Sequence, residues 1–158
     1  MPIVSPHNDN PLIDGRQSDR ALMVRRGVQR FFSDLRLSMV PEIALASGRR
    51  ADLMALSDKG EIWIVEIKSS VEDFRTDRKW PDYRAHCDRL FFATHSGVPP
   101  ELFPEDCGLI ISDGWSADLL REAPEHRLAA ASRKAVLLRF ARAAADRLLQ
   151  AELAANTI

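Results

Sequence analysis

The sequence predicts an α/β fold in which a mixed central sheet is flanked by helices and followed by a long C-terminal helix. Three observations lead to this class. Helical apolar spacing occurs near both ends of the chain, and short apolar runs bounded by turn residues lie between these helices. The run over residues 62–67 is apolar on both faces except at Glu66, which is typical of a central strand covered on both sides.

The first helix is expected over residues 18–36. Ser18 or Asp19 can cap its N-terminus, because a short polar side chain there accepts a hydrogen bond from a free backbone amide. Its apolar residues recur at helical spacing, and its arginines are assigned to the opposite, solvated side. Gly27 weakens this helix without ending it.

Three strands in a meander are expected next. The first covers residues 39–45, and a turn at Ser47-Gly48 leads into a second strand that contains Asp52. The third is the apolar run over residues 62–67. The later elements are a short helix from Val71 capped by Ser70, a second short helix over 82–89, strands over 90–94, 108–112 and 117–121, and an alanine-rich helix over 128–153 whose apolar stripe is Val136, Leu137, Phe140, Ala144, Leu148 and Leu149.

Composition indicates one globular domain. The chain has 158 residues, 46% of them hydrophobic and 28% charged, and a net charge of -1, which by itself signals neither nucleic-acid nor membrane binding. Two cysteines form neither a disulfide framework nor a zinc site. No signal sequence or long apolar run is present, so we expect a cytoplasmic protein with no membrane partner. Residues 1–17 are predicted to be a flexible N-terminal arm, residues 18–153 a single domain and residues 154–158 a tail.

The turn between the second and third strands predicts which residues face each other. Asp58-Lys59-Gly60 is a natural three-residue hairpin loop, with glycine where positive φ is needed. This loop sets Asp52 opposite Glu66 and Arg50 opposite Lys68. Because side chains two apart in a strand share a face, Asp52, Glu66 and Lys68 are expected to cluster.

This cluster has a chemical interpretation. Two facing carboxylates repel each other unless a cation lies between them, and such oxygen ligands suit Mg²⁺ or Mn²⁺. Lys68, two positions beyond Glu66, would lie close enough to polarise a water or to stabilise charge on a phosphate. The alternative is an ordinary surface hairpin with a Glu–Lys pair and a solvated Asp52. The apolar strand and the turn register favour a site for phosphodiester hydrolysis.

Other charged residues are candidate members of the site. If Ala46 faces Arg49, Glu42 lies opposite Leu53, and a single bulge would bring it level with Asp52.

Lys79 and Tyr83, one helical turn apart, either contact a scissile phosphate or pack at the helix edge. Arg49 and Arg50 either contact DNA phosphates or neutralise the acids when no metal is bound.

The order of predicted elements, and the spacing of Asp52, thirteen residues, then Glu66-Ile67-Lys68, resemble the PD-(D/E)XK nuclease superfamily. From about residue 18 to 149 the chain is similar to the bacterial MmcB-related DNA-repair family, through Gly48-Arg49-Arg50-Ala51-Asp52-Leu53, Val65-Glu66-Ile67-Lys68-Ser69, Lys79-Trp80-Pro81-Asp82-Tyr83, Cys87-Asp88, Gly108-Leu109-Ile110, Ala131-Ser132-Arg133-Lys134 and Leu138-Arg139-Phe140-Ala141-Arg142.

The resemblance implies a restriction-endonuclease-like αβββαβ core and roles for individual residues. Asp52, Glu66 and the carbonyl of Ile67 would hold Mg²⁺ or Mn²⁺, and Lys68 would orient or activate the attacking water. Many relatives add an acid from the first helix, which has only Asp19 and Asp34, near its ends. Either Glu42 replaces that acid from the first strand, or this fourth acidic position is missing.

We therefore expect a metal-dependent DNA nuclease acting in DNA repair, with DNA as its partner. The alternative is a nucleic-acid-binding or partner-docking module on the same fold, with little or no cleavage activity. A small-molecule enzyme with the same metal site is a third reading, but the chain has no glycine-rich phosphate loop. With one active site per chain, cutting both strands would call for a homodimer.

Overall fold

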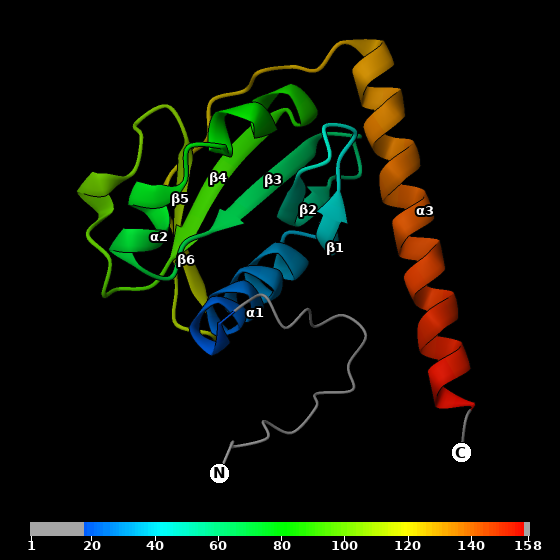
Figure 1. The fold of residues 1–158 in the computed structure, drawn as a ribbon, viewed down its shortest axis with the longest axis horizontal. Coiled ribbons are helices and arrows are strands. Elements are labelled where there is room, and N and C mark those ends of the chain that lie inside the picture. The colour runs from blue at the N-terminus through cyan, green and yellow to red at the C-terminus, as the bar shows by residue number, and fades with distance from the viewer. Residues whose placement is uncertain (1–17, 157–158) are drawn as a thin grey trace.

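The structure is a computed structural model that describes residues 18–156 (Figure 1). The predicted N-terminal arm over 1–17 lies outside the described residues. The elements are α1 (Asp19–Asp34), β1 (Ser38–Ala44), β2 (Arg50–Leu56), β3 (Ile62–Ile67), α2 (Val71–Thr76), the 3₁₀ helix η1 (Trp80–His86), β4 (Arg89–Thr94), the 3₁₀ helix η2 (Pro100–Leu102), β5 (Gly108–Ser112), β6 (Ala117–Arg121) and α3 (Ala130–Ala155).

The six strands form one sheet in the order β1-β2-β3-β4-β5-β6. Neighbours β1, β2 and β3 are antiparallel, β3, β4 and β5 are parallel, and β6 is antiparallel to β5. The parallel β3–β4 pair requires a crossover, which α2 and η1 supply. The predicted class, a mixed sheet with flanking helices and a long C-terminal helix in the order αβββαβ, is confirmed.

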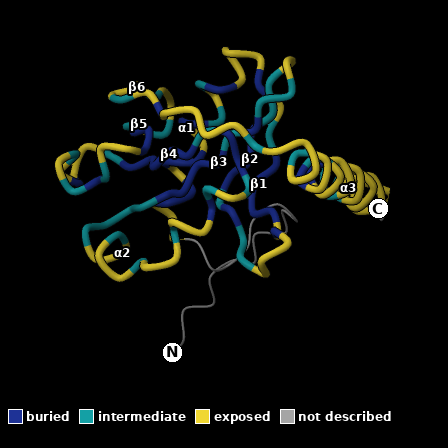
Figure 2. The backbone as a smooth tube through the Cα atoms, turned by 90° about the horizontal axis from the view of Figure 1, so that it is seen from above, coloured by how far each residue is buried: buried dark blue, intermediate teal, exposed yellow. Residues whose placement is uncertain are grey.

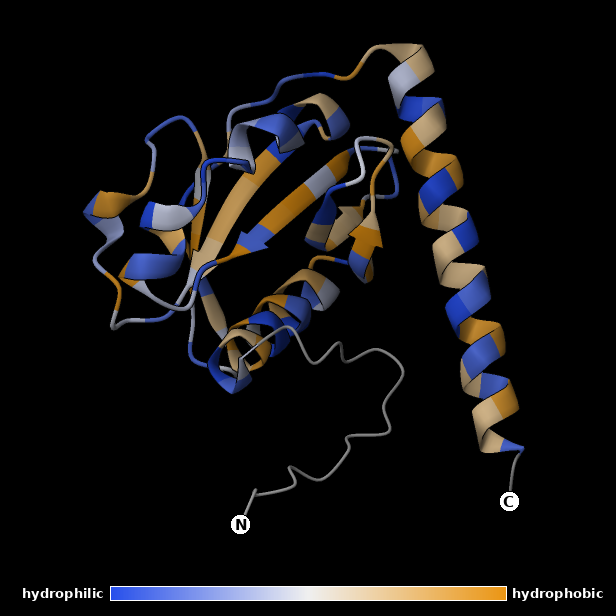
Figure 3. Cartoon of the chain, in the orientation of Figure 1, coloured by the Kyte–Doolittle hydropathy of each residue, from blue (hydrophilic) through white to orange (hydrophobic). Residues whose placement is uncertain are grey.

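Helices cover both faces of the sheet. On one face α1 packs Val24, Val28 and Phe32 against Leu53 and Val65. On the other face, α2, η1 and the first half of α3 pack against a second hydrophobic cluster, which includes Met54, Ile64 and Phe92 of the sheet. Strands β1 to β5 are largely buried and hydrophobic, whereas β6 and most of the length of α3 are exposed (Figures 2 and 3). Among the described residues, no helix combines the length and the apolar character that crossing a bilayer requires.

Helix α1 follows the predicted cap but differs from prediction on its outer side. The hydroxyl of Ser18 accepts a hydrogen bond from the amide of Ala21 at 3.1 Å. A Cβ at Gly27 would lie 1.9 Å from the Ser112 hydroxyl, so glycine here permits the close approach of α1 to the β5–β6 hairpin. The prediction that the arginines all face solvent is wrong for Arg25, which is only 5% exposed.

Two later helices also differ from the sequence-based expectations. The predicted helix over 82–89 is instead a 3₁₀ helix that ends at His86, because the amide of Asp88 already bonds to the sheet, donating to the carbonyl of Ile62 at 2.7 Å. The apolar stripe of α3 is buried only at Val136 and Phe140. Its last two members, Leu148 and Leu149, are exposed, since α3 packs on β1 and η1 only through its earlier turns.

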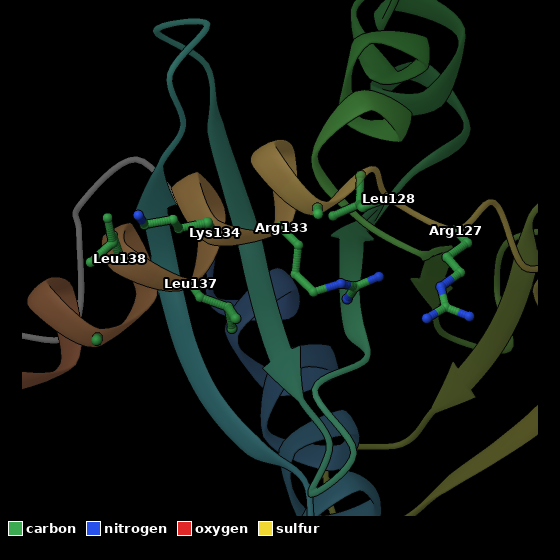
Figure 4. Close-up of a pocket in the computed structure, with 8 residues that line it drawn as sticks. Arg127, Leu128, Arg133, Lys134, Leu137 and Leu138 are labelled. Atoms are coloured by element: carbon green, nitrogen blue, oxygen red, sulfur yellow. The ribbon is translucent and has the colours of Figure 1, made fainter.

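The carboxylate of Asp88 ties α3 to the sheet. It accepts hydrogen bonds from the amides of Ile62 and Leu128, both at 2.8 Å, and a bidentate pair from the Arg133 guanidinium at 2.7 and 2.8 Å. Figure 4 shows Arg133 reaching from α3 across the strands while Lys134 points the other way. Burial alone would raise the pKa of Asp88, but Arg133 and the two amides outweigh it and hold that pKa below its ordinary value.

Replacing this carboxylate should be costly. We expect Asp88→Ala to lower the free energy of unfolding by about 3–5 kcal/mol, because Arg133 and two amides lose their partner in a buried setting. The contribution is complete above the ordinary pKa of 3.8 and disappears as the pH falls through the lowered value. Urea titration measures this. The exposed loop variant Asp58→Ala is the control and should change stability by less than about 0.5 kcal/mol; equal effects of the two variants would contradict the assigned role.

Candidate active site

The predicted site residues gather around one cavity of about 500 Å³ where β3 ends, between α1, α2 and η1. Arg50, Asp52, Glu66, Ile67, Lys68, Lys79 and Tyr83 all line it, together with Ser18, Ala21, Ser69, Asp73, Thr76 and Asp77. Two predicted members lie outside this lining. Glu42 faces a neighbouring groove, and Arg49 pairs with Asp82 at 2.8 Å.

Asp52 and Glu66 hold each other through backbone amides. The β2–β3 pairs Leu53–Val65 and Met54–Ile64 match the register predicted from the Asp58-Lys59-Gly60 turn. At the next position the amide of Asp52 donates to Glu66 Oε1 at 3.2 Å, and the amide of Ile67 donates to Asp52 Oδ2 at 2.8 Å. Each carboxylate thus takes a hydrogen bond from the opposite strand, which fixes both side chains on the rigid sheet.

The environment of Glu66 opposes its ionisation. Glu66 is 3% exposed, and this burial, followed by the charge of Asp52, raises its pKa well above the ordinary value of 4.5. The amide of Asp52 and the ammonium of Lys68 act in the opposite direction but do not offset the burial. A buried acid next to a second acid is an arrangement that a cation would stabilise.

Lys68 is held by an acid that sequence reasoning missed. Its ammonium donates to Asp77 Oδ2 at 2.6 Å, and both side chains are 12% exposed. Asp77 Oδ1 accepts from the amides of Lys79 at 2.7 Å and Trp80 at 3.2 Å. Burial would raise the pKa of Asp77, but these bonds, led by that from Lys68, lower it. An aspartate between two short helices is recognisable as a cap, but its sequence gives no sign that it reaches Lys68.

Tyr83 and Lys79 lie on the cavity wall in different ways. The hydroxyl of Tyr83 donates to the carbonyl of Arg50 at 3.0 Å and so fastens η1 to β2. Burial and the charges of Glu66 and Asp52 raise the pKa of Tyr83, which keeps this hydroxyl protonated. Lys79 is exposed at the rim.

Glu42 is level with Asp52, but no bulge brings it there. The β1–β2 loop closes between Leu45 and Arg49, so the pairing is Pro41–Leu53 and Ile43–Ala51, one residue from the predicted alignment with Ala46 facing Arg49. Glu42 adopts a φ of 49°, which breaks the alternation of side chains along β1.

The surroundings of Glu42 are cationic. Its charge acts on Arg25 and on Arg147, both of whose pKa values are lowered mainly by burial. Asp52 also acts on Arg25, whose Nε and Nη1 have no hydrogen-bond partner among the described residues. Buried arginine therefore partly balances the acids on the α1 side of the sheet.

The donor atoms of the cavity fit a Mg²⁺ or Mn²⁺ ion. Two carboxylates and the adjacent carbonyl of Ile67 are hard oxygen ligands, and Mg²⁺ in proteins commonly uses only one or two carboxylates, with water and substrate phosphate completing its shell. Within residues 18–156 no set of three or more His, Cys, Asp and Glu side chains is arranged as a metal centre.

The αβββαβ order with acids on β2 and β3 defines a fold of the restriction-endonuclease-like class. The chain belongs to the MmcB-like family, whose model, described as DNA repair protein MmcB-like, matches residues 8–155. A solved structure described as "SPO1766 protein of unknown function from Silicibacter pomeroyi" is 39% identical, with a TM-score of 0.84 over 90% of this chain and 97% of that one. No curated protein matches.

The acid pair makes a pH-dependent prediction. In EDTA, Glu66→Gln should raise the melting temperature at about pH 8 and change it little at about pH 5, because a raised pKa penalises folding only once the pH climbs above the ordinary value. The Gln oxygen can still accept the bond from Asp52. Thermal unfolding monitored by circular dichroism measures the shift.

Exposed Glu101→Gln, on η2, is the matched control and should leave the melting temperature unchanged at both pH values. A lower melting temperature for Glu66→Gln at the higher pH would contradict the environment assigned to this acid.

The Lys68–Asp77 contact can be separated from the capping bonds of Asp77. Asp77→Ala should lower the free energy of unfolding by about 2–3 kcal/mol, and Asp77→Asn, whose side-chain oxygen can still cap Lys79 and Trp80, by about half as much. In a Lys68→Met background the cost of Asp77→Asn should largely disappear. Denaturant unfolding of wild type, the two single variants Asp77→Asn and Lys68→Met, and the double variant gives this coupling energy. If Asp77→Asn costs the same in both backgrounds, Asp77 only caps the amides of Lys79 and Trp80 and does not hold Lys68.

Proposed function

We propose that this chain is a metal-dependent DNA nuclease that hydrolyses phosphodiester bonds in DNA repair. The observation that carries the proposal is the cavity in which hydrogen bonds join Asp52, near the start of β2, to Glu66, near the end of β3, with Lys68 on its wall. Membership of a DNA-repair family supports DNA as the substrate.

The residues would divide the work as follows. Asp52, Glu66 and the carbonyl of Ile67 would hold Mg²⁺ or Mn²⁺, which supplies positive charge at the phosphate and a more acidic water when bound. The ammonium of Lys68, kept in place by Asp77, would donate to the phosphate or orient the attacking water. Arg50, at the cavity rim, would contact a neighbouring phosphate.

The proposed role of Tyr83 is structural. Its hydroxyl is committed to the carbonyl of Arg50 and stays protonated, so it is unsuited to accept a proton from water. Lys79, exposed at the rim, is the better of the two to meet a DNA strand.

A second candidate function is a nucleic-acid-binding or partner-docking module with little or no cleavage activity. The position of Glu42 favours it, because this acid lines the groove beside α3 and lies close to Arg25 and Arg147 instead of lining the cavity. Calorimetric titration of Mg²⁺ and Mn²⁺ separates the two candidates, since the nuclease needs a bound cation.

Cleavage itself provides the direct test. With Mg²⁺ or Mn²⁺ present, the wild-type chain should nick plasmid, single-stranded or branched DNA, and the double variant Asp52→Ala, Lys68→Ala should be at least about 100-fold slower. Asp58→Ala, in the turn at the far end of the same hairpin, is the matched control and should retain the wild-type rate. Equal nicking by wild type and the double variant would mean that the site is wrongly assigned.

A further inference from the structure

A second concave surface lies beside the candidate active site. It is a groove of about 820 Å³ between α3 and the first two strands. Arg139, Arg142 and Arg147 line it from α3, and Glu42 and Arg50 line it from the sheet. We call it the α3 groove. Three of its four arginines thus come from one helix, at positions three and five residues apart.

Two of these arginines are free to meet a ligand. Arg139 and Arg142 are exposed, and within residues 18–156 neither forms an ion pair or a side-chain hydrogen bond. The helix as a whole carries five cationic side chains and two acidic ones, although the chain has a net charge of -1. The positive charge is therefore concentrated on this wall, where Glu42 and Asp146 offset only part of it.

The third arginine fixes the wall in position. Half-buried Arg147 donates through Nη1 to the carbonyl of Pro41 and through Nη2 to that of Glu42 at 2.5 Å. These bonds attach the second half of α3 to β1. Arg142 and Arg139 precede it in the same helix by about one and about two turns, respectively, so they are presented on a rigid support.

The groove adjoins the cavity that holds the acids, because Arg50 lines both. We propose that the α3 groove binds the phosphate backbone of the nucleic-acid strand that enters the candidate active site, with Arg139 and Arg142 as its phosphate contacts. This inference rests on the proposed function and adds to it the path of the strand. Arginine suits the task, since its planar guanidinium can bond two phosphate oxygens at once.

An acidic protein segment would also meet the charge of the groove. The position of Arg50 between the two depressions favours nucleic acid, because a ligand lying in both must present a phosphodiester to Asp52, Glu66 and Lys68 while other anionic groups lie along α3. A phosphate backbone has one negative charge on every nucleotide, so it can place one phosphodiester at the acids and further phosphates along α3.

The test measures binding without metal, so it does not depend on cleavage. A labelled single strand of about 20 nucleotides and its duplex are titrated in EDTA by fluorescence anisotropy, between about 50 and 200 mM salt. The full chain with Arg139→Gln and Arg142→Gln should bind the single strand about tenfold more weakly at the lower salt. The slope of log K against log salt should fall by about 1.4, which is 0.7 for each lost contact.

Two further double variants make the result specific. Arg26→Gln with Arg30→Gln removes the same charge from exposed positions of α1, which covers the opposite face of the sheet, and should bind within about twofold of wild type. Arg139→Lys with Arg142→Lys keeps the charge and should retain most of the salt slope. Circular dichroism confirms that each variant is folded.

Several outcomes would overturn the inference. One is unchanged DNA affinity after Arg139→Gln and Arg142→Gln, and another is an equal loss in the α1 control. A third is that the variant with Arg139→Gln and Arg142→Gln loses binding to a polyglutamate peptide but keeps its DNA affinity, which would assign the groove to a protein partner. If groove-dependent DNA binding is found but no metal condition yields cleavage, the nuclease proposal fails and the α3 groove stands.

Discussion

The arrangement of this protein depends on one buried carboxylate. Asp88, immediately before β4, binds Arg133 of α3, the amide of Ile62 in β3 and the amide of Leu128 before the helix. Because the strands follow in chain order, β6 and β1 are at opposite edges of the sheet, and yet α3, which follows β6, packs against β1. The Asp88–Arg133 pair accounts for this path, because it fixes the start of α3 near the start of β3, and the rest of the helix then extends along β1. The wall of the α3 groove exists as a result of this anchor.

A second constraint is the place where the backbone pairing of β2 with β3 ends. Beyond Leu53 and Val65 the two strands continue to bond, but through the side chains of Asp52 and Glu66 instead of backbone carbonyls. The acids are therefore part of the sheet's hydrogen bonding, and they keep their positions at the cost of an unfavourable charge on Glu66. Lys68 is constrained from the other direction, by Asp77 in the α2–η1 connection. Two separate parts of the chain thus supply the site, and the crossover between β3 and β4 brings them together.

Local patterns predicted the features that local chemistry determines. The Asp58-Lys59-Gly60 turn was sufficient to align Asp52 with Glu66, and the span of β3 followed from its continuous apolar run. The β1–β2 loop was harder, because Ser47-Gly48 permits more than one closure and the structure selects the loop that brings Leu45 to Arg49. Features that arise only from packing were missed: the burial of Arg25 beneath the sheet, the reach of Asp77 to Lys68, and the exposure of Leu148 and Leu149 where α3 runs past the sheet.

The last turns of α3, which extend past the sheet with Leu148, Leu149 and Leu153 exposed, affect the local opening of this helix. Its first half is held by Val136, Phe140 and the Asp88–Arg133 pair, and Arg147 is the last side chain of the helix with a hydrogen bond to the sheet among the described residues. Beyond Arg147 the side chains of Leu148, Leu149 and Leu153 are exposed, so opening of the final turns would leave the buried core intact. The free energy of local opening should therefore rise steeply toward the N-terminal end of the helix. The part that carries Arg139 and Arg142 lies on the well-anchored side of this gradient.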